Sequence, residues 1–410
     1  MTITRHSEHP VNQRGKMDLQ LPKGFKAAGI ISGIKKNGKK DLGLIFSQIP
    51  ANAAGVFTTN SFQAAPVILD KDRIRSGRCQ AILANSGCAN SCTGEKGLQH
   101  AKKTASWIAS ELQIPDKLVL VASTGVIGEP LPIGKIEDAV PSLIQSLSFE
   151  GALDFAEAIM TTDTVPKAAF RQIRVEGTVC TIAGIAKGAG MIHPDMATLL
   201  CFVCTDANIN TVLLSEMLSE SVGNSLNRIT IDGDTSTNDT VLIMANAASG
   251  VTVETPERVE VFQAALNEVM LELARKLVKD AEGATKLVEI LVDGAESKES
   301  AEKVANTVAG SILVKTALFG EDANWGRIMA AAGRSGIAMD PGKMDIYFDK
   351  VRMVQNGCGC GKGAEAEASL VLKKPEFRIT LHLGSGKYSA SVLTCDLSVD
   401  YIKINADYRS

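Results

Sequence analysis

The sequence predicts an α/β protein, or one of the related α+β class. Apolar runs of strand length recur along the whole chain, a long amphipathic helix lies between two of them, and no repeat of fixed period is detectable. With 45% hydrophobic and 22% charged residues over 410 residues, the composition is that of an ordinary globular protein. At this length we expect two or three domains with large cores.

The charge pattern excludes several kinds of partner. Lys and Arg (43) nearly balance Asp and Glu (46), and no block of like charge marks a surface for nucleic acid or anionic lipid. The longest uncharged stretch, residues 42–69, contains Pro50, Pro66 and several amides and hydroxyls that a bilayer would leave unsatisfied. The first fourteen residues lack the apolar run of a signal peptide. We therefore expect a cytoplasmic protein with small-molecule partners, no nucleic acid and no membrane.

Runs of β-branched and aliphatic residues predict eight strands. They cover residues 43–46, 81–84, 118–122, 179–185, 199–204, 241–244, 287–292 and 377–383.

The clearest helix is expected over residues 255–280, with Thr255 as its cap and Pro256 in its first turn. Its buried face is predicted by apolar residues at spacings of three and four, namely Phe262, Leu266, Val269, Leu273 and Leu277. Gly283 provides the stop, which places Glu282 just past the helix C-terminus, where the helix dipole disfavours a carboxylate. Glu282 is therefore either solvated or placed there to meet a cation.

The nine cysteines are too sparse for a disulfide framework, and we expect reduced thiols. Cys201 and Cys204 form a C-x-x-C inside an apolar run, which favours core packing over zinc or redox chemistry. Cys358 and Cys360 lie in the glycine-rich run 356–363, which we interpret as a turn. Neither this run nor residues 384–387 has the Walker spacing, and neither opens an apparent helix. We expect no phosphate loop, no metal and no cofactor.

Residues 187–200 form the most informative segment, because this glycine-containing loop joins two predicted strands. Thr198 stands at the start of the second strand, behind the small residue Ala197. Its hydroxyl has an ordinary interpretation, a local hydrogen bond. In a strained turn, the same hydroxyl can attack the preceding carbonyl carbon and exchange the amide for an ester, which water then cleaves. The new α-amine, with a pKa of about 7.7–8.0, can activate the threonine hydroxyl as a nucleophile.

Several motifs of the chain match one known family. They are PKGF at 22–25, AGVFTTN at 54–60, STG at 123–125, the loop at 187–200, GEDANWGR at 320–327 and YIKINADY at 401–408. On these motifs, which span almost the whole chain, the sequence strongly resembles the ornithine acetyltransferases, the glutamate N-acetyltransferases of arginine biosynthesis.

This resemblance implies a precursor that cuts itself between Ala197 and Thr198. Residues 1–197 would then form the α chain, the N-terminal part of a layered αββα-type sandwich domain. Residues 198–283 would begin the β chain with the nucleophile strand and the long helix, and residues 284–410 would form a smaller C-terminal α/β domain whose tail returns to the active site. A heterotetramer of two α and two β chains is also implied.

The implied reaction is ping-pong. Thr198 accepts the acetyl group of N2-acetyl-L-ornithine as an ester and passes it to L-glutamate. By motif match, Thr124 and Gly125 would form the oxyanion hole, in a turn after the strand at 118–122. The substrate-binding residues would be Thr161, Lys187, Thr198, Glu282, Asn405 and Ser410. We assign Lys187 to a substrate carboxylate and Glu282 to an ammonium group.

Some alternatives remain open. A self-processing amidohydrolase or aminopeptidase would use the same nucleophile but give the acyl group to water, and a binding or regulatory protein would keep its chain intact. Members of the family differ in whether they also accept acetyl-CoA as a co-substrate, and we favour the bifunctional kind. Cys88 stands where the family commonly has asparagine, which removes an amide donor and acceptor beside the pocket.

Overall fold

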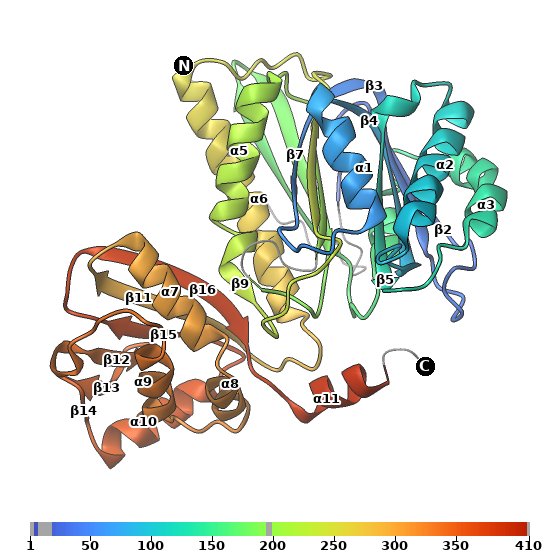
Figure 1. Cartoon of the computed structure of the whole chain (residues 1–410). Helices are drawn as coiled ribbons and strands as arrows, with labels where there is room; N and C mark the ends of the chain where they lie inside the picture. Colours follow the sequence, from blue (N-terminus) through green and yellow to red (C-terminus); the bar gives the residue numbers. More distant parts are fainter. Residues whose placement is uncertain (1–3, 7–18, 194–198, 408–410) are drawn as a thin grey trace, which may run out of the picture. The chain divides into compact units, whose positions relative to one another are not determined.

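The computed structural model describes residues 4–6, 19–193 and 199–407 (Figure 1). The chain divides into two compact units. The described residues of the first lie within 1–188, 195–227 and 235–277, and those of the second within 189–194, 228–234 and 278–410. The expected chain ends at 197 and 198 fall outside the described residues, so the three segments built on that cut stay a prediction.

In the described part of the first unit, nine strands form one mixed sheet. Its order is β1-β6-β7-β8-β10-β3-β4-β5, and β2 also pairs with β3. The strands are β1 (Thr4–His6), β2 (Phe25–Ile30), β3 (Leu42–Phe57), β4 (Arg78–Cys88), β5 (Val119–Val126), β6 (Lys167–Val175), β7 (Thr178–Lys187), β8 (Leu200–Thr205) and β10 (Thr240–Ala245).

The long strand β3 belongs to both halves of this sheet. Its first half pairs with β2 and β4, and its ladder with β4 is interrupted between Phe46 and Ala51. Its second half pairs with β10. Ile82 of β4 and Phe202 of β8 belong to one buried cluster, so the two halves of the sheet face each other across a shared core. The ring of Phe155 packs edge-on against Phe202 in that core, with 5.5 Å between ring centroids.

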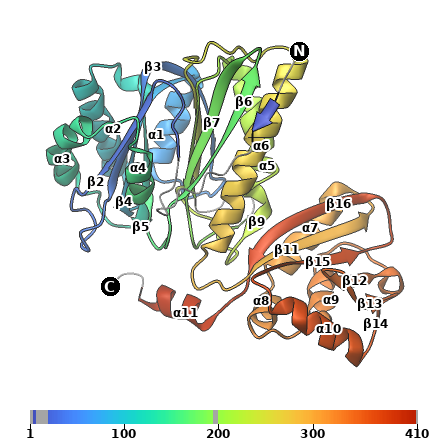
Figure 2. The ribbon, with the colours of Figure 1, turned by 180° about the vertical axis from the view of Figure 1, so that it is seen from behind.

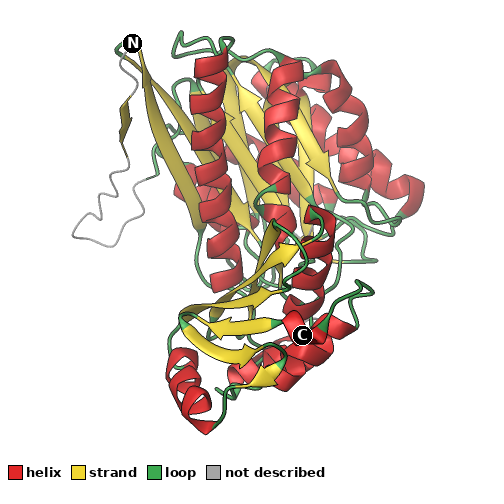
Figure 3. Ribbon diagram, turned by 90° about the vertical axis from the view of Figure 1, so that its left-hand side faces the viewer, coloured by secondary structure: helices red, strands yellow, loops and turns green. Residues whose placement is uncertain are grey.

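Helices cover the outer faces of both halves (Figures 2 and 3). Helices α1 (Ala65–Arg73), α2 (Gly94–Leu112) and α3 (Ile133–Gln145) share a second buried cluster with β3, β4 and β5. Helices α5 (Thr211–Gly223) and α6 (Pro256–Lys279) lie side by side, and Val269 and Leu273 of α6 sit directly over Gly184 of β7. Helix α4 (Ala152–Ile159) contributes Phe155 to the inner core. The layered sandwich is confirmed, with its two strand layers continuous through β3.

The predicted elements are found, most of them with small shifts of their ends, but β3 extends to Phe57 where the prediction ended at residue 46, and β4 extends beyond its prediction at both ends. Each of the eight expected strands coincides with an observed strand. Helix α6 begins at Pro256, buries the five expected apolar residues completely, and ends at Lys279, four residues before Gly283. Cys201 and Cys204 are buried in strand β8, as expected for core packing, and burial raises the pKa of the Cys201 thiol to about 12.

The second unit contains a seven-stranded sheet among its described residues, in the order β14-β13-β12-β15-β11-β16-β9. The strands are β9 (Ile229–Thr230), β11 (Leu287–Ala295), β12 (Asp345–Phe348), β13 (Val351–Gln355), β14 (Cys358–Gly359), β15 (Glu376–His382) and β16 (Tyr388–Cys395). The helices are α7 (Lys298–Ala309), α8 (Ile312–Phe319), α9 (Trp325–Gly333), α10 (Lys362–Leu372) and α11 (Val399–Ala406).

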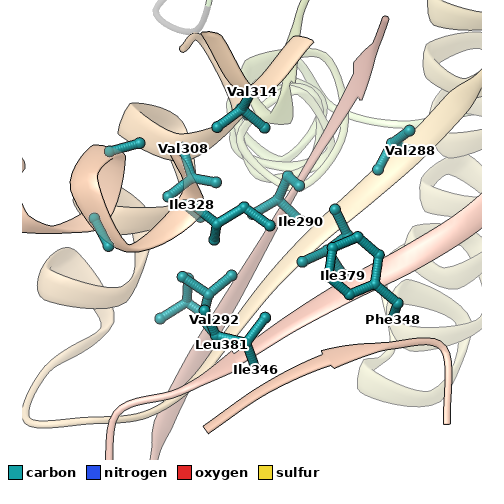
Figure 4. Close-up of a cluster of buried hydrophobic side chains, with 14 of the residues drawn as sticks. Val288, Ile290, Val292, Val308, Val314, Ile328, Ile346, Phe348, Ile379 and Leu381 are labelled. Atoms are coloured by element: carbon teal, nitrogen blue, oxygen red, sulfur yellow. The ribbon is translucent and has the colours of Figure 1, made fainter. Parts of the chain in front are cut away.

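One buried cluster holds this unit together. Figure 4 shows Ile290 and Val292 of β11 and Ile379 of β15 on the side of the sheet where Val308 of α7 and Ile328 of α9 pack. The alternation of buried and exposed residues along β15 is the two-residue period of a sheet with one face against helices.

The glycine-rich run at 356–363 differs from its prediction. Cys358 and Gly359 form the short strand β14, and helix α10 begins at Lys362, so the run does open a helix. The helix forms because Ala and Glu, both strong helix formers, follow the glycines. The Walker spacing is still absent. In the described part of the chain, no helix has the length and hydrophobicity needed to cross a bilayer.

Candidate active site

Thr124 and Gly125, the predicted oxyanion-hole residues, lie inside strand β5 and not in a turn after it, which corrects the prediction. The strand is irregular there, because Gly125 adopts a φ of +131° opposite Gly87, whose φ is +98°. A Cβ on Gly125 would lie 2.4 Å from the carbonyl carbon of Gly87. Only glycine fits this close approach of two strands, and the register of the ladder shifts beside it, at Cys88.

Amide side chains hold this irregular backbone. Asn238 donates from Nδ2 to the carbonyl oxygens of Ala89 and Ser123, over 2.7 and 2.8 Å. Asn85 accepts a hydrogen bond from the Ser123 hydroxyl, at 2.6 Å. Asn238 was not predicted from the sequence. The available signal was a run of polar residues directly before the apolar strand β10.

Lys187 connects Thr124 and Thr161, two other predicted site residues of the first unit. It is the last residue of β7, and its Nζ donates to Oγ1 of Thr124 at 3.3 Å and to Oγ1 of Thr161 at 3.0 Å. The Lys187 side chain is only 3% exposed. Because the Thr124 hydroxyl oxygen accepts from an ammonium group, its own proton is directed to another acceptor. The structure thus brings together three of the predicted site residues.

Asp163, which was not predicted, lies beneath Lys187. Its carboxylate accepts from the Lys167 Nζ at 2.6 Å and lies 4.0 Å from the Lys187 Nζ. Burial opposes the ionisation of Asp163, but Lys187 and Lys167 keep the pKa of its carboxyl below the usual range. The only sequence signal was the four-residue spacing of Asp163 and Lys167.

Leu199 marks the start of the nucleophile strand. Its N–H donates to Oδ1 of Asp239 at 2.9 Å, and its carbonyl accepts from the Thr240 N–H at 3.1 Å. Asp239 is fully buried, and its Oδ2 has no hydrogen-bond partner within the described ranges. Burial raises the pKa of this carboxyl well above its ordinary value, and the hydrogen bond from Leu199 and the charge of Lys187 oppose the shift only in part. The backbone is therefore fixed one residue after Thr198.

In the second unit, Glu282 and Asn405 lie together. Asn405 donates from Nδ2 to Oε2 of Glu282 at 2.7 Å, and the Glu282 N–H donates to the carbonyl of Ala189 at 2.9 Å. The Glu282 carboxylate lies so close to Gly190 that a Cβ there would come within 2.7 Å of Oε2. Gly190 thus leaves room for the carboxylate of Glu282.

Asp232 holds the chain that leads toward the predicted cut. Its two carboxylate oxygens accept from the N–H groups of Met191 and Ile192 at 2.6 and 2.9 Å. Oδ2 also accepts from the Tyr401 hydroxyl at 3.1 Å. Burial and the charge of Asp232 raise the pKa of Tyr401, so this residue acts as a hydrogen-bond donor.

Three predicted residues, Ala197, Thr198 and Ser410, lie outside the described residues. Cys88, which stands where an asparagine was expected, is buried, and its Sγ lies 3.5 Å from the carbonyl oxygen of Glu129. No group of three or more His, Cys, Asp or Glu residues gathers as a metal site in the described parts of the chain.

The ArgJ family model matches residues 26–410. The chain is 51% identical over 392 residues to the arginine biosynthesis bifunctional protein ArgJ of Geobacter sulfurreducens, which covers 95% of this chain and 99% of that relative. It is 50% identical over 390 residues to the protein of the same name from Desulfotalea psychrophila, with 95% and 99% covered. A crystal structure of Bacillus halodurans ArgJ is 41% identical, with a TM-score of 0.43, and the match covers 48% of this chain and 98% of that one.

The identity to these relatives, over nearly their full lengths, defines the class of protein: an enzyme of arginine biosynthesis that transfers acetyl groups between small molecules. The chain belongs to the ArgJ family.

Proposed function

We propose that this enzyme cuts itself between Ala197 and Thr198 and then transfers acetyl from N2-acetyl-L-ornithine to L-glutamate through an ester of Thr198. The observation that carries the proposal is the fixed backbone of Leu199. Both its N–H and its carbonyl are bonded, at the start of a buried strand next to β7, whose last residue is Lys187. Leu199, the residue that follows the proposed nucleophile in the sequence, is thus held by two hydrogen bonds.

Self-cleavage needs no cofactor. The Thr198 Oγ attacks the Ala197 carbonyl carbon, the C–N bond breaks, and the amide becomes an ester with a free Thr198 α-amine. Water then attacks the ester, which releases Ala197 as a carboxylate and restores the Thr198 hydroxyl. The mature β chain therefore begins with a threonine that carries its own base.

Transfer uses that amine as a proton carrier. It takes the hydroxyl proton as Thr198 attacks the acetyl carbon of acetylornithine, and it returns the proton to the departing amine of ornithine. The amine of glutamate then attacks the acetyl ester, and the threonine hydroxyl is restored. Each attack creates an oxyanion, for which we propose the Thr124 hydroxyl and the Gly125 N–H as donors. The Lys187 contact that orients the Thr124 hydroxyl supports this assignment.

The substrate-binding roles follow from charge. Lys187 is a buried ammonium group suited to a carboxylate, and Thr161 lies beside it. Glu282, held by Asn405, suits an ammonium group. Ser410 is proposed to belong to the same site. We further propose acetyl-CoA as a second acetyl donor, because the relatives are named bifunctional. We also propose that two α and two β chains assemble, as the resemblance to the family implies, and that the enzyme is cytoplasmic.

Intact-mass analysis tests this function. The purified protein should contain a polypeptide that starts Thr-Leu-Leu-Cys, and acetylornithine alone should add one acetyl group to that polypeptide. Addition of glutamate should remove the acetyl group and form acetylglutamate. Release of acetate without acetylglutamate would instead identify an amidohydrolase. Formation of acetylglutamate from acetyl-CoA as sole donor tests the second activity.

A further inference from the structure

Three ionisable side chains are buried together in the first unit: Asp163, Lys167 and Lys187. Their side chains are 0%, 1% and 3% exposed. Charged groups are removed from water to this degree only where partners compensate them, because an unpaired buried charge costs several kcal/mol. Among the described residues, the carboxylate of Asp163 faces both ammonium groups.

Asp163 lies between the two lysines of the cluster and faces both of them. Its Oδ1 accepts from the Lys167 Nζ at 2.6 Å and from the Gly188 N–H at 2.7 Å. Its Oδ2 accepts from the Thr161 N–H at 2.9 Å and faces the Lys187 Nζ at 4.0 Å. Each oxygen thus serves one backbone N–H and one ammonium group. One carboxylate thereby links the segment that carries Thr161 to the end of β7.

A third lysine contributes to the electrostatics around Lys187. This third lysine is Lys35, whose Nζ donates to the Met160 carbonyl at 2.7 Å. Burial lowers the pKa of Lys35 to about 8, with Asp41 opposing this shift and Lys187 contributing to it. The charge of Lys187 lowers the pKa of Asp239, but the larger effect of burial raises it. A substrate carboxylate bound beside Lys187 would be attracted by these cations.

We propose that Asp163 is a positioning residue of the acyl-transfer site, which holds Lys187, the Thr161 backbone and the Gly188 backbone in the geometry that receives a substrate carboxylate. This inference rests on the proposed function, since it takes Lys187 as the carboxylate-binding group. Asp163 acts through Lys187 and Thr161 and does not itself contact substrate. Lys167 pairs with Oδ1 of Asp163 and, together with Lys187, favours the ionised form of this carboxylate.

The test is Asp163→Asn, which keeps the shape but removes the charge and one acceptor. The substitution removes a negative charge that compensates the two buried ammonium groups, and it removes the carboxylate that faces Lys187. We expect KM for acetylornithine and for glutamate to rise about 10- to 100-fold, because Lys187 is proposed to hold the substrate carboxylate in ground and transition states alike. We expect a smaller fall in kcat, through the hydrogen bond of Lys187 with Thr124. The increase in KM should become larger as pH rises, because Asp163 no longer stabilises the ammonium form of Lys187.

Asp206→Asn is the matched control. Asp206 is also buried and also accepts two backbone N–H groups, from Lys23 and Thr181. It follows β8, at the strand end opposite to the Lys187–Leu200 pair. This variant should lose stability without any change in KM or in its pH dependence.

The double variant Asp163→Asn/Lys167→Met keeps the net charge of the cluster and addresses the risk that the single variant fails to fold. A raised KM in the double variant supports positioning by Asp163. Wild-type KM values in either variant would overturn the inference, because Asp163 would then serve only as a counter-charge for Lys167 or not at all. Absence of an acetyl group on wild-type Thr198 would instead overturn the proposed function, so the two failures are distinguishable.

Discussion

Asn405 donates a 2.7 Å hydrogen bond to the carboxylate of Glu282, across 123 residues of sequence. The tail helix α11 thereby holds a carboxylate that lies three residues past the end of α6. The sequence leaves two interpretations open for Glu282, a solvated side chain or one placed to meet a cation. This contact favours the second, because it fixes the position of the carboxylate. A solvated glutamate would need neither the amide partner nor the space beside Gly190.

Glu282→Gln should weaken the binding of substrates that carry an ammonium group. We expect KM for glutamate to rise about tenfold, because a charge-assisted hydrogen bond becomes a neutral one. Steady-state kinetics measure this change. Glu321→Gln is the control in the same unit, since it removes the ion pair of Glu321 with Lys286 (3.1 Å) and should leave KM unchanged. Equal KM values for wild type and Glu282→Gln would remove Glu282 from the binding site.

Thr198→Ala should remain a single polypeptide and transfer no acetyl, because the variant lacks the hydroxyl that attacks at the junction. A denaturing gel and intact mass report the first effect, and an acetylornithine–glutamate assay the second. Thr198→Ser keeps a hydroxyl and should still be cut. A Thr198→Ala protein that separates into two chains would refute the assignment.

Gly125→Ala should lower kcat by about 10²–10³ if the Gly125 N–H faces the oxyanion. The new Cβ would meet the backbone of Gly87 and Cys88, so the peptide must tilt. Gly128→Ala is the matched control, because Gly128 also has a positive φ (+86°) but has no atom within 4 Å of the new Cβ. It should lose about 1 kcal/mol of unfolding free energy and keep its turnover. Unchanged turnover in Gly125→Ala would exclude the N–H of this residue.

Asp70→Asn should remove a pH dependence of stability. Asp70 is fully buried in α1, where both its oxygens accept from the Val121 N–H, and burial raises the pKa of its carboxyl well above the ordinary value. The folded protein therefore binds this proton more tightly than the unfolded chain does, and stability falls as pH rises above about 4.

The asparagine variant keeps a carbonyl acceptor and carries no charge. Its Tm relative to wild type should therefore increase with pH, as thermal unfolding at several pH values would show. Asp72→Asn, an exposed site on the same helix, should show no such trend. A constant Tm difference across pH would mean that Asp70 titrates normally.

The fold was predictable where burial is nearly complete. Strands β8 and β10 are buried at every position, so their apolar runs predict them directly. Strand β6 was missed because its second half, with Arg171, Gln172 and Arg174, is polar. Strand β13, short and partly charged, was missed for the same reason. Thr124 and Gly125 were placed in a turn because a single sequence does not reveal the partner strand that makes a glycine irregularity possible.

The site was only partly predictable. A threonine at a glycine-rich loop and the STG motif were recognisable because their chemistry depends on local sequence. Asp163, Asn238 and Asp239 act through partners up to 149 residues away, such as the Ala89 carbonyl that Asn238 binds. Buried polar residues of this kind have no periodicity of their own, and their roles emerge only from the hydrogen bonds they make.

The order of the large sheet has a consequence for the mature enzyme. Strands β8 and β10 follow the proposed cut in the sequence, and β7 and β3 precede it. In the sheet, β8 and β10 lie between β7 and β3 and pair with them. The nick would interrupt the covalent chain but no ladder, so the two polypeptides remain interleaved and should melt as one body. Produced separately, each half would display bare strand edges and tend to aggregate. Scission at the proposed position would thus free an amine and leave the pairing of these strands intact.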